Sequence, residues 1–172
     1  ESVPVTTSRD TRAPVDFLSI TRRCFQVLAK ASDLHALIDA LVDCIVEEFG
    51  LTHVILLVND RQEQRLTTLA TRGYEKSGVG SEVFFGEGVI GVCARERIPI
   101  RIGHMTSEYR YGAAVRGSLS VNDPDWEALR QVPFPGLPDP ASQIAVPIMV
   151  DDELFGVLFS ESPTTMRFWH EE

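Results

Sequence analysis

A glycine-rich turn is the first segment of this 172-residue sequence whose spacing could support binding chemistry. Gly86, Gly88 and Gly91 match the pattern G-x-G-x-x-G, which in dinucleotide-binding proteins brings a pyrophosphate against the start of a helix. The expected strand before the turn is too short for that use, and the strand after the helix ends in Ile102-Gly103, where an acidic residue should meet the ribose. We therefore interpret the glycines as structural: they allow positive φ and close packing of a helix on a sheet. The helix start at Gly88 could still hold an anionic group.

Three cysteines, Cys24, Cys44 and Cys93, are the next candidates for chemistry. Their number is odd and their spacing fits no metal motif, so we predict no metal site. Reduced thiols in a cytosolic protein are the expectation. Cys93 follows the glycine turn, but catalysis by a thiolate needs an activating environment and a resolving partner, and the other two cysteines are expected on terminal helices.

The segment 103–141 carries side chains that could recognise a planar anion. Tyr109, Tyr111 and Trp126 could stack on a ring, and Arg110 could hold its negative charge. The length of the segment and its prolines predict a loop, and long loops inside compact domains are usually functional or disordered. The alternative is that these aromatic residues fill the space under the loop as a small core of their own.

The whole chain is acidic, with 25 Asp and Glu against 16 Lys and Arg and a net charge of −9. This balance argues against direct binding to nucleic acid or to an anionic membrane. No run of about 18 apolar residues is present, and the N-terminus lacks the apolar core of a signal peptide. We expect a cytoplasmic protein. The missing initial Met, and an expected helix that begins only at the last residues, suggest a fragment of a larger signalling protein.

The N-terminal part is expected to be a flexible tail or linker over 1–15 followed by a helix over 16–31, with Asp16 as its N-cap. Apolar residues recur in this helix at heptad spacing: Phe17, Ile20, Cys24, Val27 and Ala31. Two interpretations stay open, a seam between two copies of the chain or a helix packed on its own domain.

The rest of the chain, 33–172, is expected to form one α+β domain. A helix over 33–49 has an apolar stripe broad enough to lie on a sheet. Six strands are predicted at 54–58, 66–71, 83–85, 99–102, 144–150 and 154–159, with a short helix at 88–97 and a C-terminal helix from 168. Tight connections between successive strands favour a mainly antiparallel sheet.

Several of these segments together resemble the GAF domain family, a family of small sensory modules. The matching pieces are Gly86-Glu-Gly88-x-x-Gly91-x-x-Ala94, Pro99-Ile-x-Ile102, Ser142-x-Ile-Ala-Val-Pro147, Leu154-Phe-Gly-Val-Leu158 and Phe168-x-x-Glu171. The resemblance covers 33–172. It implies a six-stranded antiparallel sheet, with N- and C-terminal helices on one face and a ligand pocket under a long loop on the other.

The resemblance also implies a function, namely a sensory domain that binds a small-molecule effector and regulates an attached output domain, as a homodimer through its terminal helices. The alternative is a ligand-free module for dimerisation and signal relay. The residues expected around the pocket are Phe85, Ile90 and Cys93 on the turn and short helix, Tyr109, Arg110, Tyr111 and Trp126 on the loop, and Ser142 on the returning strand.

Individual branches of the family can be compared with single positions. Free methionine-R-sulfoxide reductases of this family carry a catalytic Cys where this chain has Ile90, so we predict no catalytic residue and no enzyme. The segment 103–141 has no Cys, which argues against a covalently attached bilin. Haem would need an axial ligand, and His104, a single histidine near a strand end, is more often structural. The cofactor is unknown, with a cyclic nucleotide or another small metabolite as the candidates, although the N-K-F-D-E signature of cyclic-nucleotide members is not found.

Overall fold

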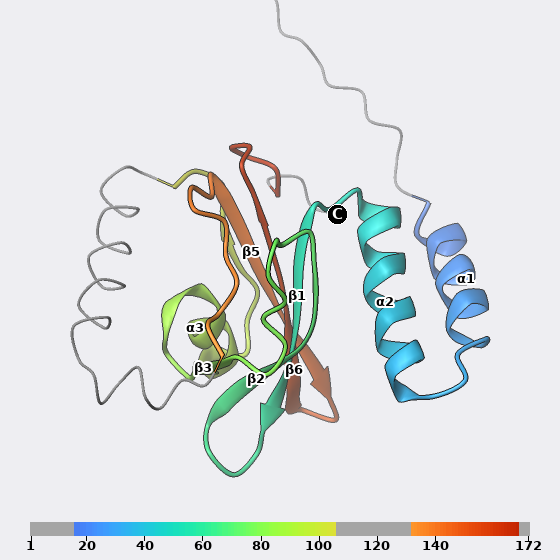
Figure 1. Ribbon diagram of the computed structural model, residues 1–172, viewed down its shortest axis with the longest axis horizontal. Coiled ribbons are helices and arrows are strands. Elements are labelled where there is room, and N and C mark those ends of the chain that lie inside the picture. Colours follow the sequence, from blue (N-terminus) through green and yellow to red (C-terminus); the bar gives the residue numbers. More distant parts are fainter. Residues whose placement is uncertain (1–15, 106–131, 169–172) are drawn as a thin grey trace, which may run out of the picture.

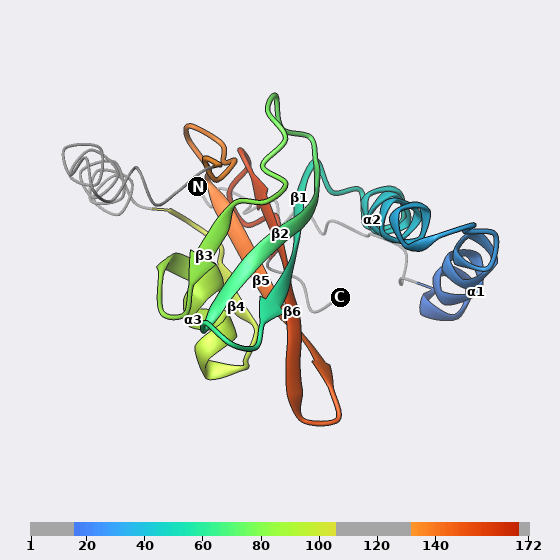
Figure 2. The same cartoon turned by 60° about the horizontal axis from the view of Figure 1, so that its bottom comes forward.

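The computed structural model describes residues 16–105 and 132–168, and these form three layers with a sheet in the middle (Figure 1). The elements are α1 (Phe17–Leu28), α2 (Leu34–Phe49), α3 (Gly88–Glu96), β1 (His53–Asp60), β2 (Arg65–Arg72), β3 (Glu82–Phe84), β4 (Ile100–Ile102), β5 (Ser142–Val150) and β6 (Glu153–Ser162). Helices α1 and α2 lie on one side of the sheet, and α3 lies on the other (Figures 1 and 2). The expected tail over 1–15 and the expected C-terminal helix, apart from Phe168, lie outside the described residues.

The sheet has six strands in the order β3-β2-β1-β6-β5-β4, and every neighbouring pair is antiparallel. The predicted α+β class and the mainly antiparallel six-stranded sheet are therefore confirmed. The two strands in the middle of the sheet run beyond their predicted ends: β1 extends to Asp60 and β6 extends to Ser162. Each of these strands is hydrogen-bonded to a neighbour on both sides. This pairing extends the strand beyond the apolar residues from which it was predicted.

Successive side chains along each strand point to opposite faces of the sheet, and both faces carry a cluster of buried apolar residues. On the α3 side, Phe159 of β6 joins Ile55 and Ile90 in the larger buried cluster. On the α2 side, Leu158 joins Val42 and Leu56 in a second cluster. Side chains at 157, 159 and 161 of β6 therefore face α3, and those at 158 and 160 face α2.

The two N-terminal helices begin at the aspartates that a capping argument selects. Asp16 accepts a hydrogen bond from the backbone N–H of Ser19 at 3.2 Å, and Asp33 accepts one from Ala36 at 2.9 Å. Helix α2 ends at Gly50, which adopts the left-handed conformation at φ +59°. The predicted N-cap at Asp16 and the predicted end of the second helix before Gly50 are thus confirmed, whereas α1 ends at Leu28, three residues before its expected end.

The expectation of three reduced thiols is wrong. Cys24 of α1 and Cys44 of α2 form a disulfide, with their Cα atoms 5.9 Å apart, and Cys93 is a buried free thiol. The pairing depends on how two helices are rotated about each other, which the spacing of cysteines along the chain does not reveal. The residues at heptad spacing in α1 therefore have different surroundings. Cys24 is bonded to α2, whereas Phe17 and Val27 are 53% and 45% exposed.

Within the described part of the chain, none of the helices combines the length and apolar character that a membrane crossing requires.

Candidate functional site

A row of polar side chains crosses three neighbouring strands on the α3 face of the sheet. In the strand register, Glu161 of β6 lies between His53 of β1 and Gln143 of β5. Residues directly opposite on antiparallel strands project from the same face, so these three side chains lie side by side. They stand at the level where β6 ends, beyond the apolar cluster under α3.

Glu161 is the central residue of this row and is only 2% exposed. One carboxylate oxygen, Oε1, accepts a hydrogen bond from the backbone N–H of Leu137 at 2.6 Å, and Oε2 accepts one from Nε2 of Gln143 at 3.1 Å. Among residues 16–105 and 132–168, no cationic side chain forms an ion pair with it. Burying a carboxylate is costly unless hydrogen bonds and a cation compensate, and a carboxylate has room for about four donors. The site can therefore accept further donors or a positive charge.

Tyr74 adds a second under-used polar group. Its hydroxyl is buried and makes no hydrogen bond of standard geometry among the described residues, although it interacts with the nearby Glu161 carboxylate. Burial raises the pKa of the Tyr74 phenol far above its usual range, and the negative charge of Glu161 and hydrogen bonding to it raise the pKa further. The ring is held edge-on against His53, with ring centroids 5.2 Å apart. Because a phenol oxygen can also accept a hydrogen bond, the Tyr74 hydroxyl has capacity for a further polar group.

Three of the predicted pocket residues lie together under α3. Ile90 and Cys93 are buried in the larger apolar cluster, and Phe85 packs against it half-buried. Burial raises the pKa of the Cys93 thiol to about 11, so the thiol is neutral near pH 7 and a poor nucleophile.

The other predicted pocket residues are not brought to that cluster. Ser142 is fully buried at the start of β5, and its hydroxyl donates a hydrogen bond to the carbonyl oxygen of Thr164 at 2.7 Å, which ties down the chain after β6. Tyr109, Arg110, Tyr111 and Trp126 lie outside the described residues.

The polar row itself was missed by the sequence-based interpretation. Glu161 is in phase with the inward-facing Val157 and Phe159, which is the signal that could have identified it. The strand was expected to end at Phe159, so the polar residues after it were assigned to the connection. Tyr74 directly follows Gly73, where the second strand was expected to stop.

Gly86, Gly88 and Gly91 have the structural role that was predicted from the sequence segments on either side of them. The N–H of Gly86 donates to the carbonyl oxygen of Gly91 at 2.8 Å, and Gly86 and Gly88 have φ of +87° and +57°. A Cβ atom at Gly91 would stand 2.1 Å from the carbonyl oxygen of Phe84. Close backbone approach therefore explains this glycine without a dinucleotide.

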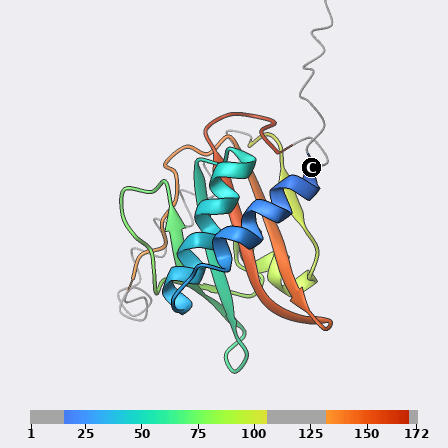
Figure 3. The ribbon, with the colours of Figure 1, turned by 90° about the vertical axis from the view of Figure 1, so that its right-hand side faces the viewer.

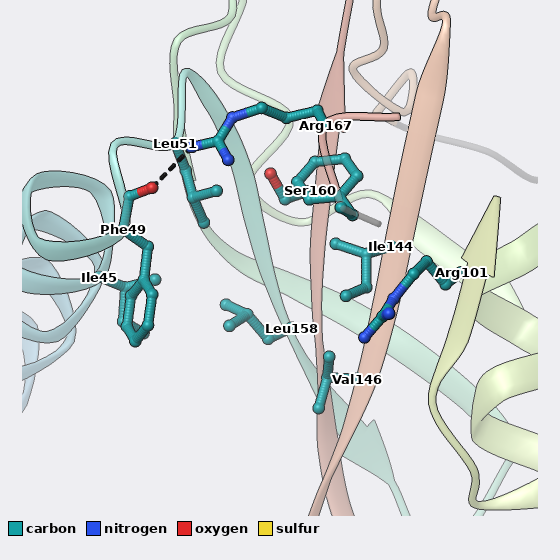
Figure 4. Close-up of a pocket in the computed structure, with 10 residues that line it drawn as sticks. Ile45, Phe49, Leu51, Arg101, Ile144, Val146, Leu158, Ser160 and Arg167 are labelled. Carbon is teal, nitrogen blue, oxygen red and sulfur yellow. Dashed lines mark hydrogen bonds between the residues drawn. The ribbon is translucent and has the colours of Figure 1, made fainter. Parts of the chain in front are cut away.

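A cavity of about 270 Å³ lies on the opposite, α2 side of the sheet (Figure 4). Ten residues line it: Ile45, Phe49, Leu51, Arg101, Ile144, Val146, Leu158, Ser160, Arg167 and Phe168. Two of its polar groups are already engaged, because Ser160 donates to the carbonyl oxygen of His53 at 2.8 Å and Arg167 donates to that of Phe49 at 2.7 Å. The cavity is thus mainly apolar, and of the predicted pocket residues that the structure describes, Phe85, Ile90, Cys93 and Ser142, none lines it.

No group of three or more potential metal ligands occurs among the residues described on either side of the gap at 106–131.

Comparison with known proteins places this geometry among GAF domains. A family model described as "GAF domain" matches residues 31–171. Similar solved structures include the GAF domain of an Acinetobacter phosphoenolpyruvate-protein phosphotransferase (17% identity, 86% of this chain and 77% of that chain, TM-score 0.63). Another is the free methionine-R-sulfoxide reductase of Neisseria meningitidis in complex with its substrate (20%, 88% and 76%, TM-score 0.60). A third is the A. aeolicus nlh2 GAF domain in an inactive state (17%, 86% and 80%, TM-score 0.57). At these identities the likeness shows the fold alone. No curated protein matches the chain.

The prediction that the chain is not an enzyme is wrong as an exclusion, because free methionine-R-sulfoxide reductases share its fold. The exclusion relied on Ile90 at the position of the expected catalytic cysteine and on the lack of a resolving cysteine near Cys93. These positions do not decide which chemistry a fold can carry, since function depends on sites that differ between members of one fold. An enzymatic role is therefore open for this chain.

Proposed function

The chain belongs to the GAF domain family, a family of regulatory, small-molecule-binding domains, and on this premise we propose that it is the sensor part of a cytoplasmic signalling protein. The proposed ligand binds on the α3 face and carries a cationic group or a pair of N–H donors that meets Glu161. Ligand binding then shifts the equilibrium between two states of an attached output domain.

The observation that carries this proposal is the buried carboxylate of Glu161 beside the Tyr74 hydroxyl, which makes no hydrogen bond of standard geometry among the described residues. An ammonium group, or the adjacent N–H donors of a guanine edge, would give the carboxylate the donors it lacks, and charge-assisted hydrogen bonds are the stronger class. Phe85, Ile90 and Cys93 supply an apolar wall next to this polar end, and a pocket with apolar walls and few polar anchors is typical of ligand sites. Tyr109, Arg110, Tyr111, Trp126 and Ser142 stay predicted contributors.

A thermal-shift experiment with defined probes tests the proposal. The probes are cGMP, which presents the paired donors of guanine; cAMP, which lacks them; and free methionine sulfoxide, which has an ammonium group. A probe at about 100 times its Kd adds about 2.7 kcal/mol of stability. In a domain of this size that raises Tm by about 5 to 10 °C.

Two matched variants make the result specific to the site. Glu161→Gln keeps the shape of the side chain but removes its charge, and we expect it to abolish the shift. Glu153→Gln makes the same change on the same strand at an exposed position and should keep the shift. A shift of equal size in wild type and Glu161→Gln would refute the proposed anchor, and no shift with any probe would favour the ligand-free alternative.

That alternative, a dimerisation and relay module, has one observation in its favour. Helix α1 exposes large apolar side chains, including Leu18 at 83% and Phe25 at 68%. Such surfaces often mark an interface with another chain. We propose that a homodimer forms through α1 whether or not a ligand binds.

A further inference from the structure

Helix α1 is attached to the domain through α2. It has no buried residue, and α2 is the one element with which it makes extensive contacts in the described structure. It lies on the outer side of α2, away from the sheet (Figure 1), and crosses α2 at an angle (Figure 3). Its position therefore depends on a single helix–helix contact.

Few interactions hold that contact together. The Arg23 guanidinium pairs with the Glu48 carboxylate, with Nε donating to Oε1 at 2.5 Å, but the Arg23 side chain is 53% exposed, and exposed ion pairs contribute little. Ile20 and Leu28 are only half-buried. A helix of 12 residues is marginal in water without packing, so the covalent link between Cys24 and Cys44 is the strongest restraint on α1.

We propose that the Cys24–Cys44 disulfide is a reversible redox modification site whose reduction by a dithiol releases α1 from α2. Disulfides in reducing compartments are commonly transient or redox-sensing, so this bond would act as a switch in the cytoplasm. The proposal rests on the proposed function for its cytoplasmic location, but it involves neither Glu161 nor a ligand, so thiol labelling can fail or succeed separately from the ligand test.

The accessibility of the two cysteines sets the order of the reaction. Cys24 is half-buried and Cys44 is 6% exposed, so a thiolate of the reductant attacks Sγ of Cys24. The S–S bond breaks, and Cys44 leaves as a thiolate that takes up a proton. The second thiol of the reductant then attacks the mixed disulfide, closes the disulfide of the reductant and releases Cys24 as a thiol. The protein gains two electrons and two protons, which the dithiol loses.

Reduction also changes the surface of α1. Phe17, Leu18 and Phe25 are exposed in the disulfide-bonded form. Once released, the helix would also expose Ile20 and Leu28, so apolar side chains would be exposed over about half of its circumference. A helix with this surface is expected either to exchange its amide hydrogens quickly or to bind another apolar surface.

Alkylation of thiols followed by mass spectrometry tests the chemistry. Protein oxidised with diamide should take up no label when native and one label, on Cys93, when denatured without reductant. After treatment with thioredoxin or dithiothreitol in the absence of denaturant, Cys24 and Cys44 should both be labelled. Three labels on the denatured, unreduced protein, or resistance of the native bond to both dithiols, would overturn the proposal.

Hydrogen exchange tests the structural consequence. Reduction should speed amide exchange in α1 at least tenfold and leave the sheet unchanged. Cys24→Ser, which replaces the half-buried partner and cannot form the bond, should show fast exchange in α1 under oxidising conditions as well. Cys93→Ala, which removes the free thiol and keeps the Cys24–Cys44 bond, should leave amide exchange in α1 as slow as in oxidised wild type. Equal exchange of α1 in the oxidised, reduced and Cys24→Ser proteins would show that the bond does not control the helix and would overturn the proposal.

Discussion

Replacing Tyr74 by Phe should make the ligand-free protein more stable, although it removes a polar group from the proposed site. In most proteins the loss of a buried hydroxyl is destabilising, because the hydroxyl has a hydrogen-bond partner. Here the Tyr74 hydroxyl makes no hydrogen bond of standard geometry among the described residues, and only its weaker interaction with the Glu161 carboxylate offsets its burial. Tyr74→Phe keeps the ring and its edge-on contact with His53.

The size of the effect follows from the cost of the unpaired hydroxyl. Leaving a buried hydroxyl without a partner costs about 1 to 3 kcal/mol. Tyr74 is half-buried as a whole residue, so we take the lower end and expect the free energy of unfolding to rise by about 1 kcal/mol. For a domain of this size that corresponds to an increase in Tm of about 2 to 4 °C. In the presence of a ligand that uses the hydroxyl, the same variant should bind more weakly.

The dependence on pH provides a second signature. The pKa of Tyr74 is raised in the folded protein above its value in the unfolded chain, about 10. The unfolded state therefore loses this proton first, and wild type loses stability as the pH rises above about 10. Tyr74→Phe removes that loss, so its advantage should grow at alkaline pH.

Urea unfolding at pH 7 and at pH 10.5 measures both effects. The matched control is Ser81→Ala, because the Ser81 hydroxyl is also buried but lies 2.9 Å from the hydroxyl of Thr68. That variant should lose about 1 kcal/mol. If Tyr74→Phe also loses 1 kcal/mol or more, the hydroxyl is already paired in the ligand-free protein, and the argument for a ligand contact there fails.

Three further predictions concern other parts of the fold. Gly91→Ala should cost about 3 kcal/mol in urea unfolding, since its Cβ would stand 2.1 Å from a backbone carbonyl oxygen, whereas Gly136→Ala, with nothing nearer than 3.8 Å, should cost less than about 1 kcal/mol. Because the pKa of Cys93 is raised to about 11, its thiol should not react with a disulfide reagent at pH 8 until the protein unfolds, and the stability that this shift contributes should be lost between about pH 9 and pH 11. Changing both Leu18 and Phe25 to Asp should halve the mass measured by light scattering if α1 forms the dimer; an unchanged mass would exclude these residues as the seam.

The sheet and the helices could be predicted because their residues carry local signals. Alternating or continuous apolar runs predict β1, β2, β5 and β6, and the aspartates at 16 and 33 mark the starts of α1 and α2. The end of β6 carries no such signal. Ser160, Glu161 and Ser162 are polar, and they continue the strand because β1 and β5 hydrogen-bond to it on both sides.

The candidate site and the disulfide depend on contacts between distant segments. The carboxylate of Glu161 meets Gln143 and the N–H of Leu137 only after three segments have come together. Cys24 and Cys44 are 20 residues apart on two helices, and their bond requires a particular rotation of one helix on the other. The apolar wall of Phe85, Ile90 and Cys93 could be predicted because those residues share one short turn and helix.

The lengths of the two edge strands also affect how copies of this domain can associate. The sheet described here ends in β3 and β4, and each of these edge strands has only three residues, whereas the central strands have eight to ten. An edge strand offers unpaired backbone groups to any other strand, and very short edges limit that pairing. Pairing of β3 or β4 with a strand of a second copy would therefore gain few hydrogen bonds, which disfavours a dimer built on these two edge strands.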